Sequence, residues 1–275
     1  MWTEPAGSAQ CLGGIMRTGL FGAAASLLLA STVPLFAADG LSLSAGMDSS
    51  SGKYGATQAT NILVMLTDLS FQTGDFRFSA ALPYLNVEGP AYFVIGSGGV
   101  PVVVNPRAGS NKTSRVGIGD LGLSATYSVP SDSIGGFDLD LTGRVILPTA
   151  GTSKGLSTGK TDFGFSADLS REMDIWTPFV TLGYRIPGEP TGYSLKSSPS
   201  VSIGTSVQTS EETLAIISYD YDAASSSSIA DSHEVFGSLS WLCSDALTLT
   251  GYGEFGFSSG APASGGGLLV TWKVP

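Results

Sequence analysis

Apolar and polar side chains alternate with a period of two along most of this 275-residue chain after residue 40, and no other feature limits its fold so strongly. Phe76, Phe78 and Ala80, for example, alternate with Arg77 and Ser79. Successive side chains of a β-strand point to opposite faces, so each such segment predicts a strand with one apolar face. We predict twelve of them, at residues 41–47, 61–72, 75–85, 116–129, 137–147, 162–170, 176–185, 200–208, 213–221, 233–242, 247–257 and 266–274.

The connections between these segments alternate in length. Short turns follow the second, fourth, sixth, eighth and tenth segments, whereas longer polar loops occupy residues 48–60, 86–115, 148–161, 186–199, 222–232 and 258–265. Short turns on one side and long loops on the other are typical of outer-membrane barrels, with periplasmic turns and extracellular loops. A soluble β-sandwich has no reason to separate its loops in this way.

The two faces of the predicted strands also suit a membrane. Charged residues fall on one face: Leu139 and Leu141 have the apolar parity, for example, while Asp140, Thr142 and Arg144 have the polar one. A charge facing lipid costs on the order of 2 to 4 kcal/mol at the midplane, and every backbone group inside a bilayer must be paired. We therefore predict an all-β fold, a twelve-stranded antiparallel transmembrane up-and-down β-barrel, in contact with outer-membrane lipid.

The first 37 residues read as a secretory signal peptide. Arg17 precedes an apolar Leu/Ala-rich run that ends in LFAADG, as a cleaved signal would. Residues 1–15 carry no basic residue, which favours Met16 as the start of the signal. The barrel is then expected over residues 38–275, and Cys243 remains as its one cysteine, so no intrachain disulfide is expected. Export without disulfides suits the bacterial outer membrane, and a net charge of −10 argues against nucleic acid as a partner.

Two glycine motifs imitate nucleotide-binding loops but fail on spacing and context. GLSTGKT, residues 155–161, has only three residues between its first glycine and Gly159, one fewer than a phosphate-binding loop requires. GIGDLG, residues 117–122, matches a dinucleotide pattern by letter. Both motifs run into strand-like alternation rather than a helix, so the anion-binding helix N-terminus is missing and no nucleotide cofactor is predicted.

The chain resembles outer-membrane β-barrel transporters of the type assigned to the MetA pathway of phenol degradation. The stretches that carry the resemblance are GIGDLGLSATY, LPTAGT, GKTDFGFSADLS and TPFVTLGYRIPGEPTGY, together with glycine-rich closing strands. The resemblance implies a barrel that passes small, hydrophobic or aromatic molecules across the outer membrane. It also implies insertion by the barrel-assembly machinery as a partner.

Ionisable residues with the inward parity are the candidate site. We predict that a set dominated by carboxylates lines the pore: Asp68, Arg77, Asp120, Asp138, Asp140, Arg144, Asp168, Arg185, Asp220 and Glu254. These carboxylates would disfavour anions while the three arginines pair across the lumen. The alternative is an ion-pair network that closes the interior.

Catalytic and metal chemistry have little support. His233 is the only histidine; the outer-membrane phospholipase, another twelve-stranded barrel, keeps its catalytic histidine at a similar place. Its His-x-Ser arrangement is absent, and Ser232 has the opposite parity, so a rim-exposed histidine is expected and no enzyme is predicted. Asp220 and Asp222 share an inward parity, yet a solvated acidic rim is preferred to a cation site; no metal or other cofactor is predicted.

The sequence thus predicts an outer-membrane channel for passive passage of small-molecule solutes, hydrophobic or aromatic ones included. Two alternatives stay open: a structural or adhesive barrel with a closed lumen, and a rim-located hydrolase that uses His233. AYFVIGSGGVPVVV, in the loop 86–115, is too apolar for an ordinary exposed loop. It either folds inward as a constriction or extends the third and fourth strands as a hairpin around residues 96–99, and the hairpin is preferred.

Overall fold

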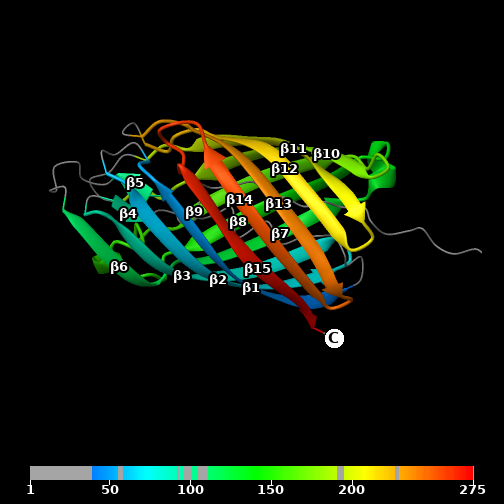
Figure 1. The fold of residues 1–275 in the computed structure, drawn as a ribbon, viewed down its shortest axis with the longest axis horizontal. Coiled ribbons are helices and arrows are strands. Elements are labelled where there is room, and N and C mark those ends of the chain that lie inside the picture. Colours follow the sequence, from blue (N-terminus) through cyan, green and yellow to red (C-terminus); the bar gives the residue numbers. More distant parts are fainter. Residues whose placement is uncertain are drawn as a thin grey trace, which may run out of the picture.

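The computed structural model describes residues 39–54, 58–91, 93–95, 101–103, 111–190, 195–226 and 229–274, which form an antiparallel β-barrel (Figure 1). The predicted signal peptide, residues 1–37, lies outside the described residues. The strands are β1 Gly40–Gly52, β2 Thr60–Thr73, β3 Phe76–Pro90, β4 Phe93–Ile95, β5 Pro101–Val103, β6 Lys112–Ile118, β7 Leu121–Val129, β8 Asp138–Leu147, β9 Asp162–Ser170, β10 Trp176–Ile186, β11 Ser198–Ser210, β12 Thr213–Asp222, β13 Ser232–Ser244, β14 Leu247–Gly256 and β15 Ser264–Val274.

The barrel closes because the first and last strands pair with each other. β1 and β15 are antiparallel neighbours from Leu41 opposite Val274 to Ser51 opposite Ser264. Each remaining wall strand pairs with its neighbours in sequence order, with β6 and β7 together forming one wall strand. Closure gives backbone groups at both edges of the sheet a partner, as a bilayer demands. The prediction of a twelve-stranded up-and-down barrel is confirmed.

Short turns and long loops lie at opposite ends, as predicted. Figure 1 shows the β4–β5 hairpin at one end and the C-terminus at the other. The β2–β3 turn consists of Gly74 and Asp75 only, and Gly74 has a φ of +53°, which a residue without Cβ adopts at no steric cost. The β7–β8 turn contains a short 3₁₀ helix, Ser131–Ile134.

The outer surface of the barrel is apolar around its whole circumference. Large hydrophobic side chains are exposed on successive wall strands, among them Leu43, Met65, Phe78, Ile118, Leu141, Phe165, Leu182, Ile203, Ile217, Leu239, Leu249 and Val270. This belt identifies a barrel whose outer solvent is hydrocarbon. No helix in the described ranges is both long and apolar enough to cross a membrane.

The fourth wall strand is broken, where the sequence predicts one strand over 116–129. β6 and β7 both pair with β3, but Gly119 and Asp120 lie between them as a bulge opposite Pro83. Gly119 donates its backbone N–H to the carbonyl oxygen of Pro83 at 2.8 Å. Proline has no N–H to continue the ladder, and a Cβ at Gly119 would lie 2.8 Å from the proline ring, so the strand must break where a glycine fits.

The loop between the third and fourth wall strands is shorter than predicted. β3 and β6 extend the wall as far as the pair Pro90–Lys112, so the third and fourth wall strands are longer than predicted. β4 and β5 form a separate two-stranded antiparallel sheet. Residues 96–100, where the turn is predicted, lie outside the described residues.

The assignment of faces can be tested at Leu141, whose side chain is 45 % exposed on the lipid face of β8. Arginine there would place a charge in hydrocarbon at a cost on the order of 2 to 4 kcal/mol. We expect Leu141→Arg to reduce sharply the fraction that folds into lipid vesicles, measured as the heat-modifiable band on SDS gels. Leu141→Ile is the control, and equal folding of both variants would contradict the assignment.

Candidate functional site: the barrel lumen

The inner surface of the barrel is polar over most of its length. Side chains of the inward parity are buried, and most carry hydroxyl or carboxylate groups, among them Ser44, Asp48, Asp68, Thr126, Asp140, Thr142, Asp168, Thr181, Ser202, Ser218, Asp220, Glu234, Ser240, Thr250 and Glu254. Neighbouring hydroxyls bond across strands, as between Thr126 and Thr142 at 2.9 Å and between Ser240 and Thr250 at 2.9 Å. The polarity of a soluble protein is therefore reversed, with the hydrogen-bonding groups inside.

Nine of the ten predicted pore-lining residues lie at inward positions of wall strands. They are Asp68, Arg77, Asp138, Asp140, Arg144, Asp168, Arg185, Asp220 and Glu254. Asp120 lies in the bulge between β6 and β7 and has a different contact: its Oδ1 accepts the backbone N–H of Ala150 at 2.9 Å. Asp120 thereby ties the loop 148–161 to the wall. That solutes pass these residues stays a prediction.

Two arginines interact electrostatically with carboxylates on other wall strands. Arg144 on β8 interacts electrostatically with Asp68 on β2 and with Asp168 on the adjacent β9. β2 and β8 are separated by β3 and β7 in the barrel, so the interaction with Asp68 joins two strands that are not neighbours. Buried charges of opposite sign compensate part of the cost of leaving water.

Arg77 adds a second connection nearer the short-turn end. Arg77 on β3 interacts with Asp140 on β8 and with Asp68, and its Nε donates a hydrogen bond to Gln72 Oε1 at 3.1 Å. Thr181 Oγ1 donates to Asp168 Oδ1 at 2.5 Å, which fixes the carboxylate that faces Arg144. Asp138 is the exception in this region, because it is only half-buried, close to the β7–β8 turn.

The third arginine lies near the loop end. Arg185 on β10 donates through Nε to Ser198 Oγ at 3.3 Å and interacts with Asp222 and Asp162. It lines a cavity with Asp222, Ser232, Glu234 and the loop residues around 224 and 262. The lumen thus continues toward the loops as a recess with an acidic floor.

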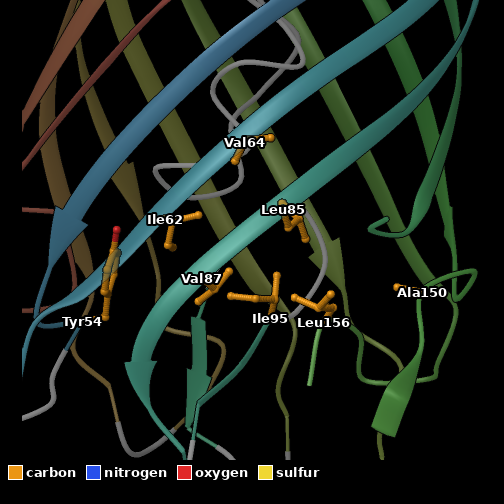
Figure 2. Packing of buried hydrophobic residues seen from close by; sticks show 8 residues of the cluster. All are labelled: Tyr54, Ile62, Val64, Leu85, Val87, Ile95, Ala150 and Leu156. Carbon is orange, nitrogen blue, oxygen red and sulfur yellow. The ribbon is translucent and has the colours of Figure 1, made fainter. Parts of the chain in front are cut away.

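An apolar cluster lies at the loop end of the lumen and adjoins that recess, since Tyr54 belongs to both. We call it the mouth cluster, and it consists of Tyr54, Ile62, Val64, Leu85, Val87, Ile95, Ala150 and Leu156 (Figure 2). Ile62 and Val64 belong to β2, Leu85 and Val87 to β3, Ile95 to β4, and the others to loops. Further along β2 and β3, Leu66 and Ala81 pack against Tyr252 and prolong the apolar strip.

The mouth cluster holds two loop elements against the inner wall. Ile95 is only 1 % exposed, and its backbone N–H donates to the carbonyl of Gly155 at 3.1 Å. Leu156 from the loop 148–161 is also buried. The chain therefore has both an inward-folded constriction and extended β3 and β6 strands, whereas the sequence suggested one or the other.

The sequence signal for the mouth cluster is visible in part. The segment NILVMLTDL of β2 is apolar at both parities, which marks a strand whose inner face is apolar too. The contributions of Tyr54, Ala150 and Leu156 come from polar loops and have no periodic signal. Loop packing depends on the closed barrel, and only the structure shows it.

The glycine motif GLSTGKT has neither the residue spacing nor the following helix of a phosphate-binding loop. The three-residue 3₁₀ helix Thr152–Lys154 ends at Gly155, and the motif then leads directly into β9 at Asp162. A helix N-terminus after Thr161 is absent from this described part of the chain. The interpretation of the motif as a structural loop is confirmed.

His233 lies on the outside of the barrel near the loops, as expected. Its Nδ1 is 2.6 Å from the hydroxyl oxygen of Tyr219, and its ring lies 5.1 Å from that of Tyr221. Ser258 Oγ accepts the backbone N–H of His233 rather than contacting the ring, and Ser232 points inward to bond Glu234. The imidazole therefore has a phenol, not a serine, as its hydrogen-bond partner.

Tyr221 Oη donates to the carboxylate of Asp231 at 3.0 Å, close to His233. The hydrogen bond from the backbone N–H of Ala224 holds the pKa of Asp231 below its ordinary value, and the weaker effect of the Tyr221 hydroxyl acts in the same direction. Asp231 is therefore an anion that anchors the loop 223–231, not a base held against His233. No group of three or more His, Cys, Asp or Glu residues suited to a metal ion occurs in the described ranges.

Comparison with known proteins finds similar folds among solved structures but no match by sequence. No family model matches the chain, and no curated protein matches it by sequence. The structure is similar to the COG4313 outer membrane channel from Pseudomonas putida F1, with a TM-score of 0.66 and 12% identity over 87% of this chain and 97% of that one. It is also similar to the NalP autotransporter translocator domain of Neisseria meningitidis, with a TM-score of 0.53 and 11% identity over 86% and 88% of the two chains.

A third similar structure is the NanC porin, with a TM-score of 0.52 and 8% identity over 85% of this chain and all of that one. At such identities the likeness establishes the fold alone. The chain is thus a membrane-spanning β-barrel, the fold that the resemblance to outer-membrane transporters implies.

The charge bridge from Arg144 to Asp68 and Asp168, which is the electrostatic interaction between them, can be tested through Arg144. We expect Arg144→Gln to lower the free energy of unfolding by about 3 kcal/mol, because it leaves Asp68 and Asp168 without this counter-charge. Urea unfolding in lipid vesicles would measure the loss. Adding Asp68→Asn to Arg144→Gln should restore part of it, and a double variant that loses the full sum of both single effects would contradict the bridge.

The mouth cluster predicts that Ile95 holds β4 against the inner wall. An aspartate there would put an unpaired charge into an apolar site, and the hairpin should detach. We expect Ile95→Asp to raise single-channel conductance at least twofold in planar bilayers. Val94→Asp, on the neighbouring half-buried position of the same strand, is the control; unchanged conductance in both would show that β4 does not restrict the mouth.

Proposed function

We propose that this chain is a bacterial outer-membrane channel for passive passage of small solutes, hydrophobic or aromatic ones included. The observation that carries the proposal is the lining: a lumen of paired polar groups that ends, at the loop end, in the apolar mouth cluster. The cluster holds β4 and the loop 148–161 against the inner wall, so the entrance is narrowed by apolar side chains. It suits a solute that sheds water before it enters.

The size of the barrel supports the proposal. Eight-stranded barrels are filled by their side chains, whereas barrels with 16 to 18 strands hold wide aqueous channels. Twelve strands leave an interior of intermediate width, which charged side chains narrow without filling uniformly. The nine predicted pore-lining residues at inward positions would then set the charge preference of the passage, with carboxylates in excess over arginines.

The same charge network favours one alternative, a structural or adhesive barrel with a closed lumen. Arg144 and Arg77 interact with carboxylates on other strands of the inner wall, and loop residues fold into the mouth. Such an arrangement blocks a passage if it never rearranges. Permeability separates the two functions directly.

The channel proposal predicts measurable permeability of the purified barrel. In planar bilayers with potassium chloride it should give discrete conductance steps with a preference for cations, and liposomes that contain it should swell in small neutral solutes faster than in large ones. Heat-denatured protein is the control. A correctly folded barrel with no conductance and no swelling would remove the channel and leave the closed barrel.

The hydrolase alternative depends on His233, whose ring contacts Tyr219 outside the lumen. We expect purified barrel to show no esterase or lipase activity that His233→Ala abolishes, because no serine contacts the imidazole among the described residues. Activity lost in His233→Ala and retained in Tyr219→Phe would establish the enzyme instead. Insertion by the barrel-assembly machinery stays a prediction.

A further inference from the structure

The loop end of the lumen has a closed part and an open part. In the mouth cluster Ile62, Val87 and Ile95 are at most 1 % exposed, so these side chains leave no space for a solute. The recess beside the cluster, which Arg185 and Glu234 line, encloses a volume of about 30 Å³. A buried water molecule needs roughly 10 to 15 Å³ of such space. The recess therefore has room for water and small ions.

Small loop residues keep the recess open. Apart from Ile229, the loop residues that line it are Ala223, Ala224, Ser225, Ala230, Gly260 and Pro262. Gly260 lets the loops 223–231 and 257–263 approach each other, because a Cβ there would collide with the carbonyl oxygen of Ala230. The two loops thus meet through small residues, and none of those named here fills the space beneath them.

Hydrogen bonds fix the rim of the recess. Asp231 Oδ1 accepts the backbone N–H of Ala224 at 2.8 Å, and Ser258 Oγ donates to the carbonyl oxygen of Asp231 at 2.7 Å. The carbonyl oxygen of Ser225 accepts the backbone N–H of Lys196 at 2.9 Å. Three loops are tied together by these bonds, so the opening is a built feature of the rim.

The floor of the recess is acidic. It is the loop end of the acidic wall, which consists of the inward carboxylates of β12 to β14: Asp220, Asp222, Glu234 and Glu254. Glu234 is close enough to Asp222 and Asp220 to interact with their charges. Arg185 interacts with Asp222 and Asp162. Carboxylates therefore outnumber the arginine at the recess, which favours the entry of cations over anions.

A file of hydroxyl groups leads from the recess into the barrel. The inward positions of β11 carry only small residues, and we call them the serine track: Ser198, Ser200, Ser202, Gly204 and Ser206. Strand register places Ser200 opposite Asp222 and Ser202 opposite Asp220. The track therefore begins at the floor of the recess and continues along the wall toward the short-turn end.

Two buried hydroxyls along this route have no protein partner. In the described part of the chain, neither Ser206 Oγ nor Ser238 Oγ has a hydrogen-bond partner, although the two residues are only 1 % and 9 % exposed. They lie on either side of Ile216 in the strand register. Buried hydroxyls almost always have a partner, and water provides it where the protein does not. These two positions therefore indicate water on the route, deeper in the barrel than the recess.

We propose that the recess is the loop-side entrance of the channel for water and small cations, and that the passage continues along the serine track. Asp222 and Glu234 give this entrance its preference for cations. The inference rests on the proposed channel and names the route that stays open while the mouth cluster is closed. Larger or apolar solutes pass only when the mouth cluster moves.

Silver ion is a suitable probe, because it is a small monovalent cation that displaces the proton of a thiol and forms an S–Ag bond. Ser225→Cys places a thiol in the recess and Ser238→Cys places one on the route. Ser157→Cys, another buried loop serine, lies beside the mouth cluster and is the matched control. All three variants are made with Cys11 and Cys243 replaced by serine.

We expect Ag⁺, added on both sides of a planar bilayer in potassium nitrate, to reduce the conductance of Ser225→Cys and of Ser238→Cys by at least half. Ser157→Cys should react at least tenfold more slowly. Inhibition of Ser157→Cys as fast as that of Ser225→Cys would overturn the proposed entrance, because the passage would then not be confined to the recess. Heat-modifiable migration on SDS gels confirms that each variant is folded.

The charge preference is tested separately through Glu234→Gln, which preserves side-chain size. At pH 8.5 the variant should lower the permeability ratio of potassium to chloride at least twofold, measured as the reversal potential in a potassium chloride gradient. Asp132→Asn makes the same charge change in the exposed β7–β8 turn and is the control. An unchanged ratio in Glu234→Gln, or an equal change in both variants, would contradict a cation preference set at the recess.

The silver experiment separates this proposal from the channel itself. Conductance that Ag⁺ leaves unchanged in Ser225→Cys and Ser238→Cys would keep the channel and overturn this entrance. A folded barrel with no conductance would overturn both. Inhibition of both variants, with Ser157→Cys unaffected over the same time, would support the recess as the entrance.

Discussion

The whole structure depends on a hydrocarbon solvent around the sheet. Lipid cannot donate or accept hydrogen bonds, so each backbone group in the wall must pair with a neighbouring strand, and β1 must meet β15. The same solvent draws apolar side chains outward and leaves the inward positions to serine, threonine and charged residues. Closure and reversed polarity are thus two results of one constraint.

This reversed polarity carries a desolvation cost for the charged groups of the lumen. Charged groups placed inside a narrow barrel lose water, and they must be compensated by opposite charge or by hydroxyl donors. The chain uses both means in different places. On the side formed by β2, β3, β8 and β9, Arg144 and Arg77 compensate the carboxylates, whereas serine hydroxyls donate to Asp220 and Glu234 on β12 and β13.

The two sides of the lumen differ in chemistry, since one is apolar and the other is acidic. Only β15 and β1 separate the acidic wall of β12 to β14 from the apolar wall of β2 and β3. Two glycines of β15, Gly265 and Gly267, leave room for side chains of β14 to reach β1.

Local patterns predicted a large part of this architecture. Alternation of Phe76, Arg77 and Phe78, and its equivalents elsewhere, determined the strands and their faces, because side-chain direction in a strand depends only on the position along it. It also placed nine of the ten candidate residues at inward positions. Asp120 departs from the pattern because the bulge opposite Pro83 releases it to hold the loop 148–161.

The sequence by itself determined how many strands form, which residues face lipid, and which end carries the loops, since period and spacing are properties of the chain alone. The tertiary structure decided which inward residues meet. The approach of Tyr252 to Asp48, the charge bridge from Arg144 to Asp68 and the burial of Leu156 all join segments far apart in sequence. Such contacts depend on the register of every strand between them and on closure, and no local pattern encodes the sum of those registers.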